Sequence, residues 1–304
     1  MLYPDFNELV SLKNRKARLK HPSNRLVNSI APGDNFSTLR GQGLEFDSVR
    51  EYVPGDDIRN IDWRVTARMG KPHLKLFRQE HERHIVICVD MNQSMRFGTR
   101  NTFKSVQAAH VAAILGGRAL ANNDRVSGCL FGDVPEALQF FAPSRNRKSL
   151  YPVLKMLAAP FSEQHTISLE RALEAICRGA QTGSLIYVIS DFMEIKNNVH
   201  EQMVMHRLSK KCQVVFIAVN DPADKEICPV GLLGFSASNS KWVVNTSDHA
   251  GRKVFKDQWD QNRQYLYELT AKLKIPLIEL TTQSELHQVL AVELKRITGK
   301  RKLR

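Results

Sequence analysis

Hydrophobic and polar positions change their pattern at about residue 84. From there to the end, short runs of β-branched and apolar residues alternate with longer segments whose apolar residues recur at helical spacing. Because near-continuous apolar strands that alternate with helices are typical of a parallel sheet covered on both faces, the pattern predicts an α/β fold. The runs predict strands over 84–90, 125–133, 136–144 (at a sheet edge), 184–192, 212–221 and 275–282, and a polar hairpin over 231–246. The segments between them predict helices over 104–123, 148–160, 168–182, 198–211, 253–274 and 285–297.

The first 82 residues have a different texture. An amphipathic start precedes a stretch over 40–77 that is dense in Gly, Pro, Asp and Arg. Its short alternating segments predict short strands and ordered turns rather than a large core. We therefore predict a small β-rich N-terminal subdomain over 1–82 and an α/β domain over 83–304.

Charged residues of both signs are interspersed in the stretch 40–77. Such a density suits a web of Arg–carboxylate hydrogen bonds that fixes the turns, with Trp63 as a buried anchor. A scaffold is the predicted role, and a partner-binding surface is the alternative. The charged residues concerned are Asp56, Asp57, Arg59, Asp62, Arg64 and Arg68.

Candidate chemistry lies where the predicted strands end. Ligands of parallel α/β sheets sit beyond the carboxyl ends of the strands, and two predicted strands end on Asp90 and Asp191. Asn92 and Ser94 follow Asp90 at i+2 and i+4, and Thr166 stands just ahead of a predicted helix. Short carboxylate and hydroxyl side chains suit a hard divalent cation such as Mg²⁺. The alternative is that Asp90 and Ser94 only cap a turn or the next helix.

This set resembles the metal-ion-dependent adhesion site of von Willebrand factor type A domains. The pattern of that site is Asp-x-Ser-x-Ser, then a threonine, then an aspartate at a later strand end. Asp90, Ser94, Thr166 and Asp191 match it, whereas Asn92 stands where a serine is expected. The resemblance implies a bound Mg²⁺, or Mn²⁺ or Ca²⁺ in its place, with Asn92 as a longer and neutral ligand.

The segments "EFDSVREY", "PGDDIRNIDW" and "TARMGKPHLK", together with "FGTR" at 97–100, support a second resemblance. They are similar to the hallmark motifs of the MoxR-associated family called domain of unknown function 58. The resemblance implies a von Willebrand factor A-like (Rossmann-like) sheet flanked by helices, directly after the hallmark segment. It also implies a MoxR-type AAA+ ATPase as partner, acting with this chain in chaperone-like maturation or assembly of client proteins.

The charge balance suggests an alternative function. With 44 Lys and Arg against 31 Asp and Glu, the formal net charge is +13, which favours anionic partners. Binding to an anionic surface or to nucleic acid through the termini is therefore an alternative, although solvated termini are the simpler interpretation. Specific nucleic-acid recognition is not predicted, because no zinc-finger spacing or ribonucleoprotein motif accompanies the charge. The two basic runs are Lys13, Arg15, Lys16, Arg18 and Lys20, and Lys300, Arg301, Lys302 and Arg304.

The cysteines and the apolar runs indicate a compartment. The five cysteines form no CxxC pair, and Cys88, Cys129 and Cys212 lie in or beside strand-like runs, as buried thiols of a reducing compartment do. No apolar run reaches the ~18 residues that a membrane span needs, and the polar start does not resemble a signal peptide. We predict a cytoplasmic protein without an integral membrane segment.

Enzyme motifs are missing from the sequence. There is no GxxxxGK[ST] loop and no G-x-S-x-G elbow, and "HERH" fails as a zincin motif because Ile85 stands at the second histidine position. Metal-dependent hydrolysis by Asp90 and Asp191 is the remaining enzymatic alternative, with His165 as a lone candidate base. The predicted protein is a non-enzymatic interaction module that uses no small-molecule substrate.

Overall fold

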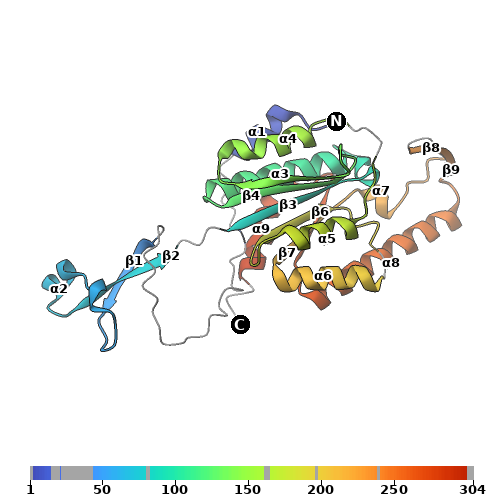
Figure 1. Cartoon of the computed structure of the whole chain (residues 1–304). Helices are drawn as coiled ribbons and strands as arrows, with labels where there is room; N and C mark the ends of the chain where they lie inside the picture. Colours follow the sequence, from blue (N-terminus) through green and yellow to red (C-terminus); the bar gives the residue numbers. More distant parts are fainter. Residues whose placement is uncertain are drawn as a thin grey trace. The chain divides into compact units, whose positions relative to one another are not determined.

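The computed structural model describes residues 3–14, 21, 44–79, 83–160, 165–195, 198–237 and 240–299 (Figure 1). The chain forms two compact units. The α/β unit consists of Met1–Ser29 and Arg83–Arg304, and the small unit consists of Ile30–Glu82.

A six-stranded sheet forms the centre of the α/β unit, with the strand order β10-β7-β6-β3-β4-β5. All neighbouring strands are parallel except β5, which runs antiparallel to β4 at one edge. The α/β class with a mostly parallel sheet is therefore confirmed, as is the edge position of 136–144. The strands are β3 (His84–Met91), β4 (Arg125–Gly132), β5 (Leu138–Ser144), β6 (Leu185–Ser190), β7 (Gln213–Asn220) and β10 (Leu277–Thr281).

Helices cover both faces of the sheet because side chains alternate along each buried strand. On β3, Ile85, Ile87 and Val89 point into one core, and Val86 and Cys88 point into the other. The first core contains side chains of α1, α3, α4 and α9, and the second contains side chains of α5, α6 and α8. The helices are α1 (Phe6–Asn14), α3 (Lys104–Ala121), α4 (Tyr151–Leu157), α5 (Leu169–Gly179), α6 (Val199–Lys211), α8 (His249–Leu273) and α9 (Leu286–Gly299).

Helix α1 packs on the α/β unit, although the sequence places it in the N-terminal subdomain. Leu9 is fully buried in the core beneath α3. A β-carbon on Gly117 of α3 would lie 2.1 Å from the carbonyl oxygen of Lys13, so only glycine allows this approach. Lys13 itself is buried, donates a hydrogen bond to the Arg147 carbonyl oxygen at 2.6 Å, and lies 4.0 Å from the Tyr151 ring centroid. Lys13 is therefore not part of a solvated basic run.

The other residues of the two basic runs lie outside the described residues. They are Arg15, Lys16, Arg18 and Lys20, and Lys300, Arg301, Lys302 and Arg304. Cys88, Cys129 and Cys212 are buried free thiols, as the sequence predicts. Within the described ranges, no helix has the length and apolar character that a bilayer crossing requires.

A hairpin follows the short helix α7 (Pro222–Lys225), as the sequence predicts for 231–246. It consists of β8 (Leu232–Ala237) and β9 (Ser240–Asn245).

In the small unit, an antiparallel pair of strands carries a short helix. Strands β1 (Leu44–Glu51) and β2 (His73–Gln79) flank the 3-10 turn η1 (Ile58–Asn60) and helix α2 (Trp63–Met69). Asp62 caps α2 by accepting hydrogen bonds from two backbone amides, and Gly70 ends it in a left-handed conformation. Trp63 is 68% exposed, so the predicted buried anchor is wrong. The helix is held by its caps and by the hydrogen bond from the His73 amide to Thr66 Oγ1.

His21 contributes a buried polar contact to the central sheet. A hydrogen bond of 2.7 Å joins its Nδ1 to the hydroxyl of Tyr187 on β6. Burial, and secondarily the charges of Arg83 and Arg118, lowers the pKa of His21 to about 3. The imidazole is therefore neutral in the folded protein at every pH above about 3.

This depressed pKa predicts acid sensitivity. The unfolded chain binds a proton at His21 below about pH 6.5, whereas the folded chain does not. The free energy of unfolding should therefore fall by about 1.4 kcal/mol per pH unit as pH drops below that value, on account of this residue. Urea denaturation of wild type and His21→Gln between pH 7.5 and 5 should show a shallower pH slope in the variant. Exposed His206 offers a control, since His206→Gln should leave the slope unchanged.

Candidate functional site

Asp90 lies at the carboxyl end of β3, and its carboxylate is buried and hydrogen-bonded on both oxygens. The Asn92 amide donates to Oδ1 at 2.9 Å, and the Ser190 hydroxyl donates to Oδ2 at 2.6 Å. The Ser190 hydroxyl in turn accepts from the Phe192 amide at 3.1 Å. The turn after β3 is thus tied to the end of β6, and the bond from the Asn92 amide is a turn cap of the kind that the alternative interpretation predicts for Asp90.

Asn92 makes a two-point contact with the backbone at Ile167. Its Nδ2 donates to the Ile167 carbonyl at 2.9 Å, and its Oδ1 accepts from the Ile167 amide at 3.3 Å. A serine side chain is too short to offer both a donor and an acceptor in this way. A β-carbon on Gly132 would lie 2.6 Å from the Asn92 nitrogen, so a glycine at the end of β4 makes room for the turn. Asn92 therefore fixes the loop that carries Thr166.

Asp191 follows β6 and binds the ammonium group of Lys104. Lys104 Nζ lies 2.9 Å from Asp191 Oδ2 and 3.1 Å from each carboxylate oxygen of Asp224. The other Asp191 oxygen accepts from the Met193 amide at 3.1 Å. All three charged side chains are buried, and Lys104 is the first residue of α3. This lysine–aspartate triad joins the start of α3 to the ends of β6 and β7.

Lys104 pairs with Asp191 at the end of β6, but not with Asp90 at the end of β3. Burial, followed by the charge of Asp191, raises the pKa of Asp90 to about 7. Burial alone would lower the pKa of Lys104, but the charges of Asp191 and Asp224 outweigh it and raise that pKa. Within the described residues no ion pair of Asp90 is found. Asp90 is therefore a buried carboxyl group without an ion-pair partner among the described residues, and its raised pKa favours the protonated form.

Two further strands also end on aspartates, which the sequence analysis did not use. Asp221 after β7 accepts hydrogen bonds from the backbone amide and hydroxyl of Thr99 at 2.9 and 2.6 Å, and from the Thr282 hydroxyl at 2.8 Å. Asp133 after β4 pairs with Arg96. The signal was in the chain, because "FGD" and "VND" end predicted strands just as Asp90 and Asp191 do.

Buried Arg263 of α8 lies behind the site. Its Nη2 donates to the backbone carbonyl of Asp191 at 3.2 Å and to Asn220 Oδ1 at 2.6 Å. Its guanidinium also lies 5.1 Å from the Trp259 ring centroid. No sequence motif marks Arg263, since a lone arginine in an amphipathic helix looks like a surface residue.

The remaining predicted residues, Ser94, Thr166 and His165, are more accessible to solvent than Asp90 and Asp191. Ser94 is half-buried in the 3-10 turn η2 (Gln93–Arg96), Thr166 is exposed, and His165 is half-buried beside it. Asp90 is hydrogen-bonded to the Asn92 amide and to Ser190, the chain neighbour of Asp191, whereas Ser94 lies on the adjoining turn and Thr166 lies beside Ile167, which Asn92 contacts. In the described parts of the chain no group of three or more His, Cys, Asp and Glu residues is arranged to hold a metal.

The donor set nevertheless fits a hard cation. It offers two carboxylates, two hydroxyls and an amide oxygen, all of them oxygen ligands of the kind that Mg²⁺ prefers. Each carboxylate oxygen that accepts one hydrogen bond retains a further lone pair. Lys104 pairs with Asp191 and Asp224, whereas burial and the charge of Asp191 raise the pKa of Asp90.

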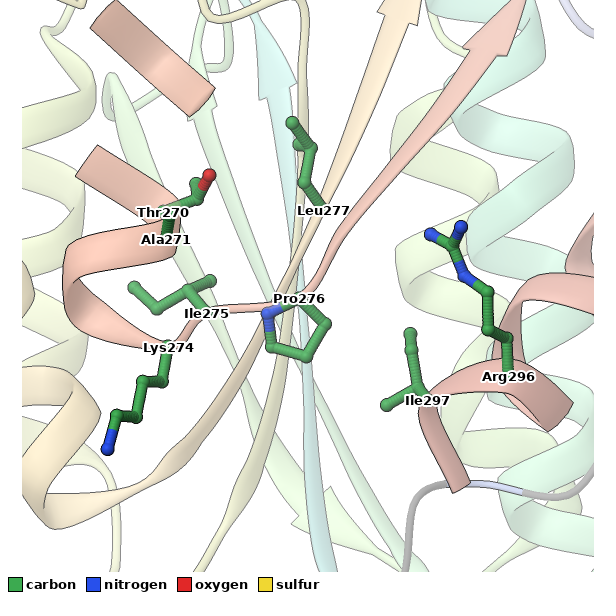
Figure 2. A pocket seen from close by; sticks show the side chains of 8 residues that line it. All are labelled: Thr270, Ala271, Lys274, Ile275, Pro276, Leu277, Arg296 and Ile297. Carbon is green, nitrogen blue, oxygen red and sulfur yellow. The ribbon is translucent and has the colours of Figure 1, made fainter. Parts of the chain in front are cut away.

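A pocket of about 440 Å³ lies at the opposite end of the sheet, where β10 begins (Figure 2). Ile275, Pro276, Leu277 and Ile297 line it, with Lys274 and Arg296 also among its walls. Because β10 and β3 run in the same direction, this pocket is remote from the carboxyl end that carries Asp90.

The triad predicts a large stability effect. Lys104→Met leaves Asp191 and Asp224 buried without their cation and should lower the free energy of unfolding by about 3–5 kcal/mol. Chemical denaturation measures the change. The double variant Lys104→Met/Asp224→Asn should lose less than Lys104→Met alone, since it removes one stranded charge. Exposed Lys295→Met is the matched control, with a change within about 0.5 kcal/mol.

Comparisons with known proteins support a family but no activity. The uncharacterized protein Rv1480 of Mycobacterium tuberculosis is 27% identical over 210 residues, which cover 67% of this chain and 64% of that protein. The uncharacterized protein Mb1516 of Mycobacterium bovis gives the same values. The chain thus spans less than two thirds of the length of these relatives.

The matches among solved structures have low identity and TM-scores below 0.5. The conserved hypothetical protein BatB from Bacteroides thetaiotaomicron has 14% identity and a TM-score of 0.44, and the match covers 71% of this chain and 99% of that one. An aerotolerance-related membrane protein from Bacteroides fragilis has 12% identity and a TM-score of 0.42 over the same shares. The family model described as "Protein of unknown function DUF58" matches residues 48–265. Since this match spans more than half of the chain, the protein belongs to the DUF58 family.

Proposed function

We propose that this protein is a non-enzymatic interaction module whose α/β unit is von Willebrand factor A-like and binds a divalent cation at the carboxyl ends of β3 and β6. The observation that carries the proposal is the buried carboxylate of Asp90, which lies near Asp191 and lacks an ion-pair partner among the described residues. A divalent cation at this position supplies the missing positive charge. Mg²⁺ is the proposed ion, with Mn²⁺ or Ca²⁺ as substitutes.

The chain's own residues define how this cation would be held. Asp90 and Asp191 would supply the charged oxygens, and Ser94 and Thr166 would supply hydroxyls from two separate loops. Asn92 would contribute by fixing the Thr166 loop through Ile167, with its Oδ1 retaining one lone pair for the ion. When bound, the cation offers a coordination position to a carboxylate of another protein, which makes docking metal-dependent.

The proposed partner follows from family membership rather than from the geometry. A MoxR-type AAA+ ATPase is the partner that the family resemblance implies, with chaperone-like assembly or maturation of client proteins as the process. We place the protein in the cytoplasm, which the buried free thiols of Cys88, Cys129 and Cys212 support. Binding to anionic surfaces through the basic termini has less support, because Lys13 is buried.

One observation favours a second function, metal-dependent hydrolysis. A carboxylate whose pKa lies near 7 is suited to general-base chemistry at neutral pH. Against it, Ser190 and the Asn92 amide already occupy one lone pair on each oxygen of this carboxylate. Turnover of phosphate or ester substrates that requires both Mg²⁺ and Asp90 would favour hydrolysis over docking.

The docking proposal predicts a metal-dependent complex. The full chain should bind the purified ATPase in the presence of Mg²⁺, and EDTA or Asp90→Asn should weaken the complex at least tenfold. Asp90→Asn keeps the side-chain shape and removes the charge that attracts the cation. Calorimetry measures binding to the ATPase, and Mg²⁺ titration measures binding of the cation. Exposed Asp257→Asn on α8 is the control, and equal binding by wild type in EDTA would contradict the proposal.

The Asn92 contact predicts a separate effect on metal affinity. Asn92→Ala removes both hydrogen bonds to Ile167 and frees the loop that carries Thr166. Residues that orient ligands in this way typically change metal affinity by about 10–100-fold, so Mg²⁺ binding should weaken by at least tenfold. Titration calorimetry with Asn60→Ala as control measures this. An unchanged Mg²⁺ affinity would show that Asn92 does not support the site.

A further inference from the structure

Helix α2 of the small unit presents one continuous exposed stripe. In a helix, residues at i, i+1, i+4 and i+5 share one side, and these positions are Trp63, Arg64, Ala67 and Arg68. All four residues are exposed. We call them the Trp–Arg stripe.

The Trp–Arg stripe contributes little to the folding of the small unit. Trp63 leaves 68% of its surface in contact with solvent. Arg64 and Arg68 are like charges at i and i+4, an arrangement that destabilises a helix. The helix is instead held from other positions, by the Asp62 cap, by Gly70 and by Thr66. We therefore look for a role other than folding for Trp63, Arg64 and Arg68.

The surroundings of the stripe have the composition of a protein interface. Ile58 in η1 is 62% exposed, Met69 at the end of α2 is 64% exposed, and Val53 is 55% exposed. Tryptophan and arginine are the residues most enriched among those that dominate binding energy, and methionine is also enriched at interfaces. A two-stranded sheet with one short helix has little core of its own, which explains why these apolar groups stay outside.

The positive charges of Arg64 and Arg68 indicate the chemistry of the partner surface. Two acidic side chains in the described part of the small unit are already engaged: Asp56 pairs with Arg50 at 2.6 Å, and Asp62 caps α2 and lies 3.8 Å from Lys75. Across the described residues no ion pair engages the guanidinium of Arg64 or Arg68. A complementary surface must therefore bring carboxylates beside an apolar pocket. The rest of this chain is a poor candidate, since the formal net charge of the whole is +13.

Nucleic acid fits this surface less well than an acidic protein. Exposed carboxylates such as Glu51 and Asp57 interrupt the positive charge of the small unit. Phosphate backbones favour uninterrupted basic surfaces, and their affinity derives mainly from released counterions. The isolated Ile58 and Met69 side chains have no counterpart in a phosphate backbone.

We propose that the Trp–Arg stripe is a docking site for an acidic protein surface that has an apolar pocket for Trp63 and carboxylates for Arg64 and Arg68. Resting on the proposed function, the inference assigns this surface to the partner ATPase. The contact is independent of the cation at Asp90. The partner therefore holds the chain at two places, and only one of them responds to Mg²⁺.

The test measures the affinity of the full chain for the purified MoxR-type ATPase by biolayer interferometry, in Mg²⁺ and in EDTA. Trp63→Ala and the charge reversal Arg64→Glu/Arg68→Glu should each weaken binding at least tenfold in Mg²⁺, with unchanged thermal midpoints. Matched controls lie on α6, where Met203 is 56% exposed and Arg207 is exposed. Met203→Ala and Arg207→Glu should leave the affinity within twofold of wild type.

The outcomes separate this inference from the proposed function. Binding that is lost in EDTA or in Asp90→Asn but unaffected by Trp63→Ala overturns the inference and leaves the proposed function standing. Binding that needs Trp63 but ignores EDTA supports the inference and overturns metal-dependent docking. Absence of binding by wild type overturns both.

Two other results would also overturn the stripe as a protein-docking site. A fall of 5 °C or more in the thermal midpoint of Trp63→Ala would mean that the chain itself covers this tryptophan. Binding of a 20-base-pair DNA duplex at 150 mM salt that Arg64→Glu/Arg68→Glu abolishes would identify nucleic acid as the ligand.

Discussion

One buried ammonium group determines how the functional end of the sheet is built. Lys104 begins α3, directly after the turn that leaves β3, and it contacts Asp191 after β6 and Asp224 after β7. Burying carboxylates without a cation is strongly unfavourable, so these strand ends can assemble only with the lysine in place. Asp90 lies outside this arrangement, and burial followed by the charge of Asp191 raises its pKa to about 7, which favours the protonated form. The same edge of the sheet therefore contains both the triad that stabilises it and the carboxyl group at which we propose a cation.

Much of the fold is visible in the sequence because the buried strands are short, apolar and separated by amphipathic helices. Every strand and helix predicted after residue 84 is present in the structure. Asp90 and Asp191 were identifiable because both end such strands. Asn92 was identifiable only because it stands where the Asp-x-Ser-x-Ser pattern has a serine. Its contact with Ile167 joins residues 75 positions apart, and no local signal predicts a contact over that separation.

Other features could not be predicted for physical reasons. A lysine at the start of an amphipathic helix, such as Lys104, normally extends into solvent, so its burial depends on two aspartates more than 80 residues away. The error at Trp63 has a different cause. A lone tryptophan in a polar, turn-rich segment suits a small core and a binding surface equally, and only its 68% exposure distinguishes them. The charges of Arg64 and Arg68 were likewise assigned to a scaffold that in fact uses Arg50 and Asp56.

The division of the chain has a mechanical consequence. The small unit is inserted between two segments of the α/β unit, so tension on it is carried by two chain connections at once. One leads to β3, which is hydrogen-bonded on both sides within the sheet and resists a pull along its length by shear. The other leads back to His21 and then to α1, which are attached through side chains: His21 is hydrogen-bonded to Tyr187, and Lys13 of α1 donates to the Arg147 carbonyl oxygen. A partner that pulls on the small unit would thus load the side-chain contacts of His21 and α1 before it disrupts the backbone pairing of β3, which makes the N-terminal segment the yielding element.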